Sequence, residues 1–345
     1  MPPVSASASS AALGQWRRAV LVYHSGGRTA AQWQRHLMRV DADGRFTGQW
    51  LFDGAILTAQ SYNGRDLMYG GFSGEELDGL LGQLFADAFQ LDAAATALAA
   101  RFGAPNAPHG VVIGVPWLSP ATRTLTLPDA SQPLDLSAPD QRVRAMDWYL
   151  EQIASRAAEA DWKHLRLYGA YYHREEIIDA YDDPAFVASF NAGAHARGMK
   201  TVWVPYYGAP HMWDATELGF DVSNVQPSVA FRGHQYGGQA GNGRLYALGQ
   251  DSKAHSQAYE YETSTAGQTQ PENWLSHQYL AVARHCGIDV FPQVFYTGTS
   301  DDMFDTVTTQ AAAIGDRWWC YNDLADYLAG RPISRASIRS PGLRP

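Results

Sequence analysis

The chain has 345 residues, a formal net charge of −9 and 46% hydrophobic residues. That length suits one barrel of about 250 residues with long loops, and the apolar fraction is enough for a large core. An acidic chain without a basic stripe is a poor partner for nucleic acid, and no apolar run reaches the roughly 18 residues that span a membrane.

Both ends of the chain differ in composition from its centre. Residues 1–14 are rich in Ala, Ser and Pro but lack the apolar core of a signal peptide, and we expect a disordered leader there. Residues 331–345 hold Pro, Ser and Arg and predict a flexible tail. Residues 15–330 are then expected to form one catalytic domain.

Eight short apolar segments punctuate this domain, and most are continuous runs rather than alternating ones. Continuous runs are typical of strands buried on both faces, as in parallel sheets. The predicted strands are Ala19–Tyr23, Gly54–Ala59, Val111–Pro116, His164–Tyr172, Lys200–Pro205, Val222–Gln226, Ser256–Glu262 and Asp289–Tyr296.

Helical patterns separate most of these strands. We predict helices over Ala30–Val40, Gly74–Phe102, Ser137–Ala160, Pro184–Arg197 and Pro271–Cys286. Long loops are predicted at Pro116–Ser137 and, because it is rich in glycine, at Phe231–Gly249. Alternating strands and helices indicate an α/β fold, and eight strands favour a single closed (β/α)8 TIM barrel with long loops on its C-terminal face.

Two pairs of glutamates lie where barrel enzymes carry functional groups, at the C-terminal ends of strands. Glu175 and Glu176 follow the fourth predicted strand, and Glu260 and Glu262 end the seventh. Because Glu260 and Glu262 are two apart, they point to the same side of their strand. A carboxylate inside a barrel is solvated, paired or used in chemistry. The structural alternative is a set of buried ion pairs with Arg166 or Arg174.

Two carboxyl groups astride a bond are what glycoside hydrolysis requires, one as general acid and one as nucleophile or base. We expect one of Glu175 and Glu176 to be the acid. Glu175 is preferred, because Glu176 and Ile177 look like the start of the next helix. For the second role, Glu262 and Glu260 rank nearly equal.

Other strand ends supply polar and flat groups that suit a sugar ring. Any one of them is more often a packing residue, and the set carries more weight than its members. The candidate substrate-binding residues are His24, Gln60, Trp117, Tyr172, His173, Tyr206, Tyr207, His211, Trp213, Gln226 and Tyr296.

Further residues with reactive side chains are expected to be structural. Asp53 and Asp221 precede strands and so belong to the opposite, stability face of the barrel. Cys286 and Cys320 make no metal motif, and the sequence leaves open whether they pair.

Rival chemistries find little support in the sequence. It contains no Gly-x-Ser-x-Gly elbow, no phosphate-binding loop and no His-Glu-x-x-His motif. We therefore predict no metal site and no cofactor. His173 lies beside Glu175 and is expected to be a hydrogen-bonded pocket histidine rather than a metal ligand.

Several motifs resemble those of the DUF4855 family. They are Gly169-Ala170-Tyr171-Tyr172-His173-Arg174-Glu175-Glu176-Ile177, Gly198–Tyr207, Trp213, Leu218-Gly219-Phe220-Asp221, Gln226-Pro227 with Phe231, Tyr259-Glu260-Tyr261-Glu262, and Trp50-Leu51-Phe52-Asp53-Gly54. The resemblance is ordered from about Ala19 to Tyr327. It implies a bacterial barrel protein related to glycoside hydrolases and often exported. Tyr172-His173 stands where the family often has Trp.

The sequence thus predicts a glycoside hydrolase that acts on a polysaccharide or oligosaccharide by a two-carboxylate mechanism. One alternative is a carbohydrate-binding barrel without catalysis, and another is a different barrel enzyme, either a lyase or a metal-dependent hydrolase. We expect an exported protein, periplasmic or extracellular, with a cytoplasmic location left open. The sugar, the stereochemistry and the oligomeric state do not follow from the sequence.

Overall fold

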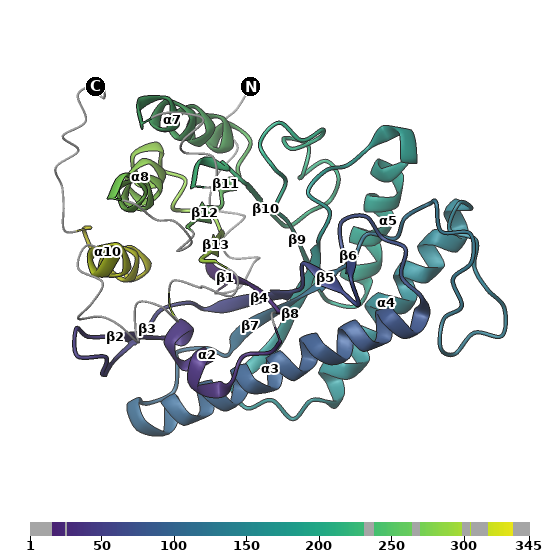
Figure 1. The fold of residues 1–345 in the computed structure, drawn as a ribbon, viewed down its shortest axis with the longest axis horizontal. Coiled ribbons are helices and arrows are strands. Elements are labelled where there is room, and N and C mark those ends of the chain that lie inside the picture. Colours follow the sequence, from purple (N-terminus) through teal and green to yellow (C-terminus); the bar gives the residue numbers. More distant parts are fainter. Residues whose placement is uncertain are drawn as a thin grey trace.

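A ring of parallel strands forms the centre of the computed structural model, which describes residues 16–24, 26–230, 238–263, 270–298, 304 and 317–333. Helices lie around the strands (Figure 1). The strands of the central sheet are β1 (Arg18–Tyr23), β4 (Gly54–Thr58), β7 (His109–Val115), β8 (Leu165–Tyr172), β9 (Lys200–Trp203), β10 (Val222–Val225), β11 (Ala258–Tyr259), β12 (Tyr261–Glu262) and β13 (Gln293–Tyr296).

The sheet closes on itself through one divided strand. Its order is β11-β10-β9-β8-β7-β4-β1-β13-β12, and every pairing is parallel. β11 pairs with β10 and β12 pairs with β13, and only Glu260 separates the two halves. The Glu260 backbone N–H still donates to the carbonyl of Val225. The fold is therefore a (β/α)8 barrel, as the sequence predicts.

Helices cover the outside of the barrel, and two small hairpins lie in the connections. In Figure 1, α3 and α4 run beneath the strands, while α7, α8 and α10 line one flank. The helices are α2 (Ala30–Leu37), α3 (Gly74–Phe102), α4 (Pro139–Glu159), α5 (Asp183–Ala196), α7 (Gly238–Ala254), α8 (Gln270–Cys286) and α10 (Arg317–Leu328), with the 3₁₀ turn η1 (Asp179–Tyr181). The hairpins are β2 (Met38–Val40) with β3 (Phe46–Trp50), and β5 (Ser61–Tyr62) with β6 (Arg65–Asp66).

The predicted glycine-rich loop over Phe231–Gly249 is wrong for residues 238–249, which belong to α7. Residues 231–237 lie outside the described part of the chain. Leu245 and Leu248 of α7 are fully buried. A Cβ built on Gly249 would lie 2.7 Å from Sγ of Cys286 on α8. Gly249 lowers the intrinsic helix propensity of α7, but its small size allows α7 to pack closely on α8.

The helix predicted over Ala30–Val40 ends earlier than expected, because its last three residues form the short strand β2. Thr29 caps α2 in a reciprocal capping box with Gln32, and the helix ends at Leu37. Met38 and Val40 are buried in β2 and pair with β3. The predicted boundaries of α3 are confirmed, and Ser73 with Glu76 forms a capping box at its start.

Two cores lie on either side of the strands, as alternation of side chains along a strand requires. The barrel interior holds Ile56, Val112 and Tyr171. Trp16 closes its amino end by stacking on Tyr168 at 4.7 Å between ring centroids. A Cβ on Gly54 would lie 1.9 Å from the Trp16 ring nitrogen, so only glycine leaves room for the indole.

Asp53 and Asp221 lie at the amino ends of the strands and hold backbone there. Asp53 accepts hydrogen bonds from the backbone N–H groups of Arg17 and Arg18 at 2.7 and 2.8 Å. Asp221 accepts from the backbone of Thr201 and from the Lys200 ammonium. Both residues are structural, as expected from their positions.

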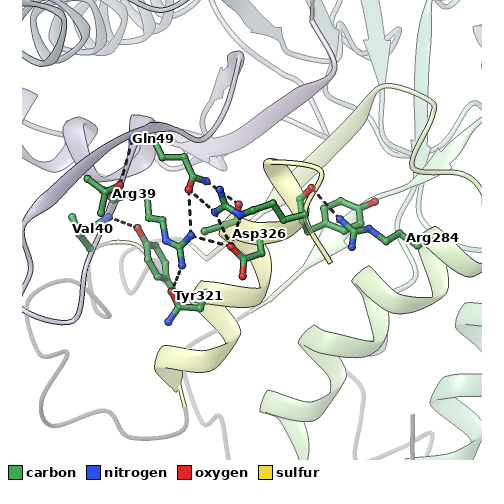
Figure 2. A network of polar contacts seen from close by, with 11 residues as sticks. Arg39, Val40, Gln49, Arg284, Tyr321 and Asp326 are labelled. Carbon is green, nitrogen blue, oxygen red and sulfur yellow. Dashed lines mark hydrogen bonds and ion pairs between the residues drawn. The ribbon is translucent and has the colours of Figure 1, made fainter. Parts of the chain in front are cut away.

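A polar network ties the β2–β3 hairpin to the last helix (Figure 2). The Arg39 guanidinium donates to Asp326 at 2.9 Å and to Asn322 at 2.6 Å, both on α10. The Tyr321 hydroxyl accepts from the Val40 backbone N–H at 2.8 Å. These bonds fasten α10 against an early part of the chain and so support the closure of the barrel.

Cys286 and Cys320 are both buried, and they do not form a disulfide bond. None of the helices that the structure describes combines the length and apolarity needed to cross a bilayer. The predicted leader and all but the first three residues of the predicted tail fall outside the described residues.

Candidate active site

Three glutamates gather at the barrel mouth, which is the opening at the carboxyl ends of the strands. Glu175 follows β8, Glu260 joins β11 to β12, and Glu262 ends β12. All three are largely removed from water. Their charges also act on one another, because Glu262 and Glu175 raise the pKa of Glu260 and Glu175 raises the pKa of Glu262. We call Glu175, Glu260 and Glu262 the mouth cluster.

Glu262 is the best-supported carboxylate of the mouth cluster. Its Oε1 accepts a hydrogen bond from the backbone N–H of Ser228 at 3.0 Å, and its Oε2 accepts from the Tyr279 hydroxyl at 2.5 Å. Burial raises the pKa of Glu262 to about 7, and these two donors oppose the rise because they stabilise the ionised form. Glu262 is thus able to change charge near neutral pH.

Ser228 adopts a left-handed backbone conformation, with φ of 55°. That conformation costs a non-glycine residue on the order of 1 kcal/mol. It occurs in the residue whose N–H faces Glu262, and backbone strain of this kind tends to collect at functional sites.

Glu260 is more deeply buried and less well supported. Its side chain is 2% exposed, and its Oε1 has no hydrogen-bond partner in the described residues. Burial first, and then the charges of Glu262 and Glu175, hold the pKa of Glu260 well above the ordinary value of a glutamate. Burial and the two like charges therefore favour the protonated form of Glu260.

Glu175 comes from an earlier part of the chain than Glu260 and Glu262. It accepts a hydrogen bond from a side-chain amide. The Gln226 side-chain N–H donates to Oε1 of Glu175 at 2.8 Å. Burial raises the pKa of Glu175, the Gln226 bond lowers it, and the charges of Asp66 and Glu176 raise it further. The balance favours a protonated Glu175 at a higher pH than for a solvated glutamate.

Glu176 differs from Glu175 because it forms an ion pair with an arginine. Arg174 donates to Oε1 of Glu176 at 3.0 Å, and the Tyr206 hydroxyl donates to Oε2 at 3.2 Å. The expectation that Glu176 and Ile177 begin a helix is wrong, since η1 begins at Asp179. Arg174, one of the two arginines considered as ion-pair partners for Glu260 and Glu262, pairs with Glu176 instead.

Aromatic and imidazole groups form the floor beneath the mouth cluster. His173 is buried, shares a hydrogen bond of 2.9 Å with Thr58, and contacts the rings of Tyr23 and Tyr171 edge-on. Burial lowers the pKa of His173 to about 3, so its ring is neutral. Tyr296 packs edge-on against Tyr23 at 5.7 Å between ring centroids.

Three of the expected substrate-binding residues are turned away from the mouth. Tyr172 alternates with Tyr171, is fully buried, and packs outward against Phe190. Trp117 is buried under the Arg174 guanidinium, 3.7 Å from the ring centroid. Trp213 stacks on a histidine that precedes the amino end of β11. A position at or after the end of a strand predicts that an aromatic residue faces the mouth. These three side chains instead pack against other parts of the protein.

The remaining expected residues lie in the connections after the strands. His24 bonds to Asp87 of α3 at 2.6 Å, and Gln60 is exposed. The Tyr207 ring lies 4.1 Å from the Arg244 guanidinium. His211 faces carboxylates with both ring nitrogens, Asp214 at 2.8 Å and Asp179 at 2.9 Å, and these raise its pKa although burial opposes them.

Sequence reasoning missed three groups that act on Glu262. Tyr279 lies on α8 and Arg244 on α7, and the Arg244 charge lowers the pKa of Glu262. Ser228 contributes through its backbone. Of these three groups, only Tyr279 could have been predicted from the sequence, because it is a tyrosine in the amphipathic helix that follows the acidic strand. Within the described residues no three His, Cys, Asp or Glu side chains are grouped to hold a metal ion.

Residues 18–319 match the model of the family described as "Domain of unknown function (DUF4855)". No curated protein gives a significant match.

Solved structures with related folds come from several kinds of enzyme. A family GH18 chitinase catalytic domain from the fern Peteris ryukyuensis has a TM-score of 0.46 and 13% identity, over 90% of this chain and 99% of the chitinase. An exo-beta-1,4-mannosidase from Opitutaceae bacterium strain TAV5 has a TM-score of 0.44 and 14% identity, over 81% of this chain and 52% of its own. A mutant tryptophan synthase alpha-subunit from Pyrococcus furiosus has a TM-score of 0.40 and 9% identity, over 91% and 98%. The chain therefore spans about half the mannosidase, and likenesses this distant do not bear on its activity.

Proposed function

This chain belongs to the DUF4855 family, and from the mouth cluster we propose that it is a glycoside hydrolase acting on a polysaccharide or an oligosaccharide. The observation that carries the proposal is that Glu175, which follows β8, and Glu262, which ends β12, share one buried electrostatic environment. Hydrolysis of a glycosidic bond needs two carboxyl groups, one as general acid and one as nucleophile or base.

Glu175 is assigned as the general acid. A raised pKa helps a carboxyl group to keep the proton that it gives to a leaving oxygen, and burial raises the pKa of Glu175. Glu176 is a weaker candidate, because Arg174 and the Tyr206 hydroxyl already engage its two carboxylate oxygens.

Glu262 is assigned as the second carboxylate, which attacks the anomeric carbon or activates water. It has two hydrogen-bond donors and the nearby Arg244 charge, all of which favour its ionised form. Glu260 has no such donor on Oε1, so it serves as a neutral acid beneath Glu262 rather than as a nucleophile. The anomeric configuration of the first product, read by proton NMR, distinguishes attack by Glu262 from activation of water.

The experiment is a digestion screen. The unmodified protein is incubated with a panel of neutral polysaccharides and oligosaccharides, and released reducing ends are measured with and without a chelator. We expect cleavage of at least one member that a chelator does not suppress. Thermal stabilisation by a glycan without any product would instead support a binding protein, and loss of activity with the chelator would support metal-dependent hydrolysis.

A further inference from the structure

A hollow lies on the end of the barrel that carries the mouth cluster. It has a volume of about 620 Å³. Its walls come from the connection after β7, the connection after β8, and the first turns of α4 and α5, which follow those strands. Every wall therefore belongs to the carboxyl-end face, where barrel enzymes bind their ligands.

The hollow presents one exposed aromatic ring. Tyr181, the last residue of η1, lines it with 46% of its surface open to solvent. Phe186 and Val143 provide an apolar floor, and Asp140 and Asp182 line the hollow as well. An aromatic face with acceptor oxygens close by suits a sugar ring, whose C–H face is apolar and whose hydroxyls donate hydrogen bonds.

The base of the hollow is held rigidly. Arg142 is buried, donates to Oδ1 of Asp183 at 2.7 Å and to the carbonyls of Leu118 and Tyr181, and lies 3.8 Å from the centroid of the Phe186 ring. Arg142 is the single cation among the lining residues, and its three nitrogens all have partners. An anionic ligand thus finds carboxylates and no free cation there, so the chemistry favours a neutral glycan.

A continuous set of contacts joins the hollow to the mouth. The Tyr181 ring packs on Trp117 at 5.8 Å between centroids, and the Arg174 guanidinium lies on the Trp117 ring. Arg174 in turn pairs with Glu176, the neighbour of Glu175. A glycan cut at the mouth would extend along this side of the face.

We propose that this hollow is a distal subsite that binds a neutral sugar unit of the same chain, with Tyr181 as its stacking platform. This inference rests on the proposed function. It adds that the enzyme prefers chains long enough to reach from the mouth cluster to Tyr181.

The test compares Tyr181→Ala with Phe89→Ala, a matched control whose ring on α3 is 50% exposed but lies outside the hollow. Binding of manno-, xylo-, cello- and chito-oligosaccharides, from disaccharide to hexasaccharide, is measured by calorimetry in a Glu262→Gln background so that no ligand is cleaved. We expect Tyr181→Ala to weaken binding of the longest ligand about tenfold, as loss of one aromatic contact implies, and Phe89→Ala to leave it unchanged.

Two outcomes separate this inference from the proposed function. If Tyr181→Ala binds every length as the parent does, or if no oligosaccharide binds the parent, the subsite does not exist. If long chains bind through Tyr181 but the unmodified protein cleaves none, the subsite stands and the hydrolase proposal fails.

Discussion

The Tyr279 hydroxyl donates a hydrogen bond of 2.5 Å to Oε2 of Glu262, and it reaches that oxygen from α8, outside the barrel. A helix of the outer layer thereby sets the charge state of a carboxylate at the mouth. Burial alone would raise the pKa of Glu262 further than the value of about 7 that it has.

Replacing Tyr279 with phenylalanine removes a donor to the ionised form of Glu262, so the pKa of Glu262 rises. Because Glu262 acts when ionised, we expect the acidic limb of the kcat/KM profile to move up by about one pH unit. Tyr261→Phe is the control, since the Tyr261 hydroxyl bonds to Ser276 on the outer side. A Tyr279→Phe profile that overlays the parent would contradict the role of Glu262.

Gln226 donates a hydrogen bond to Glu175, as Tyr279 does to Glu262. Its amide donates to Oε1 of Glu175 and lowers the pKa of that carboxyl. Gln226→Met therefore raises the pKa of Glu175, and because Glu175 acts when protonated, the alkaline limb of kcat/KM is expected to extend to higher pH. Movement of the acidic limb alone would reverse the two assignments.

The mouth cluster also makes stability depend on pH. The pKa of Glu260 is raised in the folded protein, so the folded state holds a proton that the unfolded state releases above about pH 4.5. The free energy of unfolding contributed by Glu260 therefore falls as pH rises from that point. Glu260→Gln keeps the shape and removes the titration.

We expect urea denaturation of Glu260→Gln to show a smaller loss of stability between pH 5 and pH 8 than the parent shows. Each unit of pKa difference corresponds to about 1.4 kcal/mol. The same variant is expected to retain turnover, because a neutral amide replaces a neutral acid. Stability curves that run parallel, or a loss of turnover as large as that of Glu262→Gln, would exclude a protonated Glu260.

A deeply buried ion pair lies away from the mouth cluster. Arg142 and Asp183 are 4% and 0% exposed in their side chains, and removal of one partner leaves a buried charge. We expect Arg142→Ala to lower the free energy of unfolding by about 3–5 kcal/mol. Arg45→Ala is the control, because its pair with Asp43 is exposed, and a loss of similar size there would show that burial is not the cause.

The sequence was informative where a strand is short, apolar and followed by a polar group. All eight predicted barrel strands are confirmed. Tyr259 and Tyr261 bond to α8 residues through their hydroxyls, which leaves Glu260 and Glu262 together on the other side of the strand, as predicted. Local pattern suffices there because a short, continuous apolar run is typical of a strand buried on both faces.

Features that depend on contacts between distant segments were not predictable. α7 forms despite its glycines because Gly249 allows close packing on Cys286. Tyr172 faces outward because Tyr171 faces inward, and the sequence does not mark which of two adjacent tyrosines does so. The donors to Glu262 come from Ser228 and Tyr279, 34 and 17 residues away.

The central claim is that Glu175 and Glu262 carry the hydrolysis, and the most direct test measures turnover of Glu175→Gln and Glu262→Gln on the glycan found by the screen. We predict that kcat falls at least about a hundredfold in each, with melting temperatures within a few degrees of the parent, while Glu217→Gln, at an exposed site, keeps full activity. Undiminished turnover in either variant would contradict the account, and unfolding of both would show that the two carboxyl groups are structural.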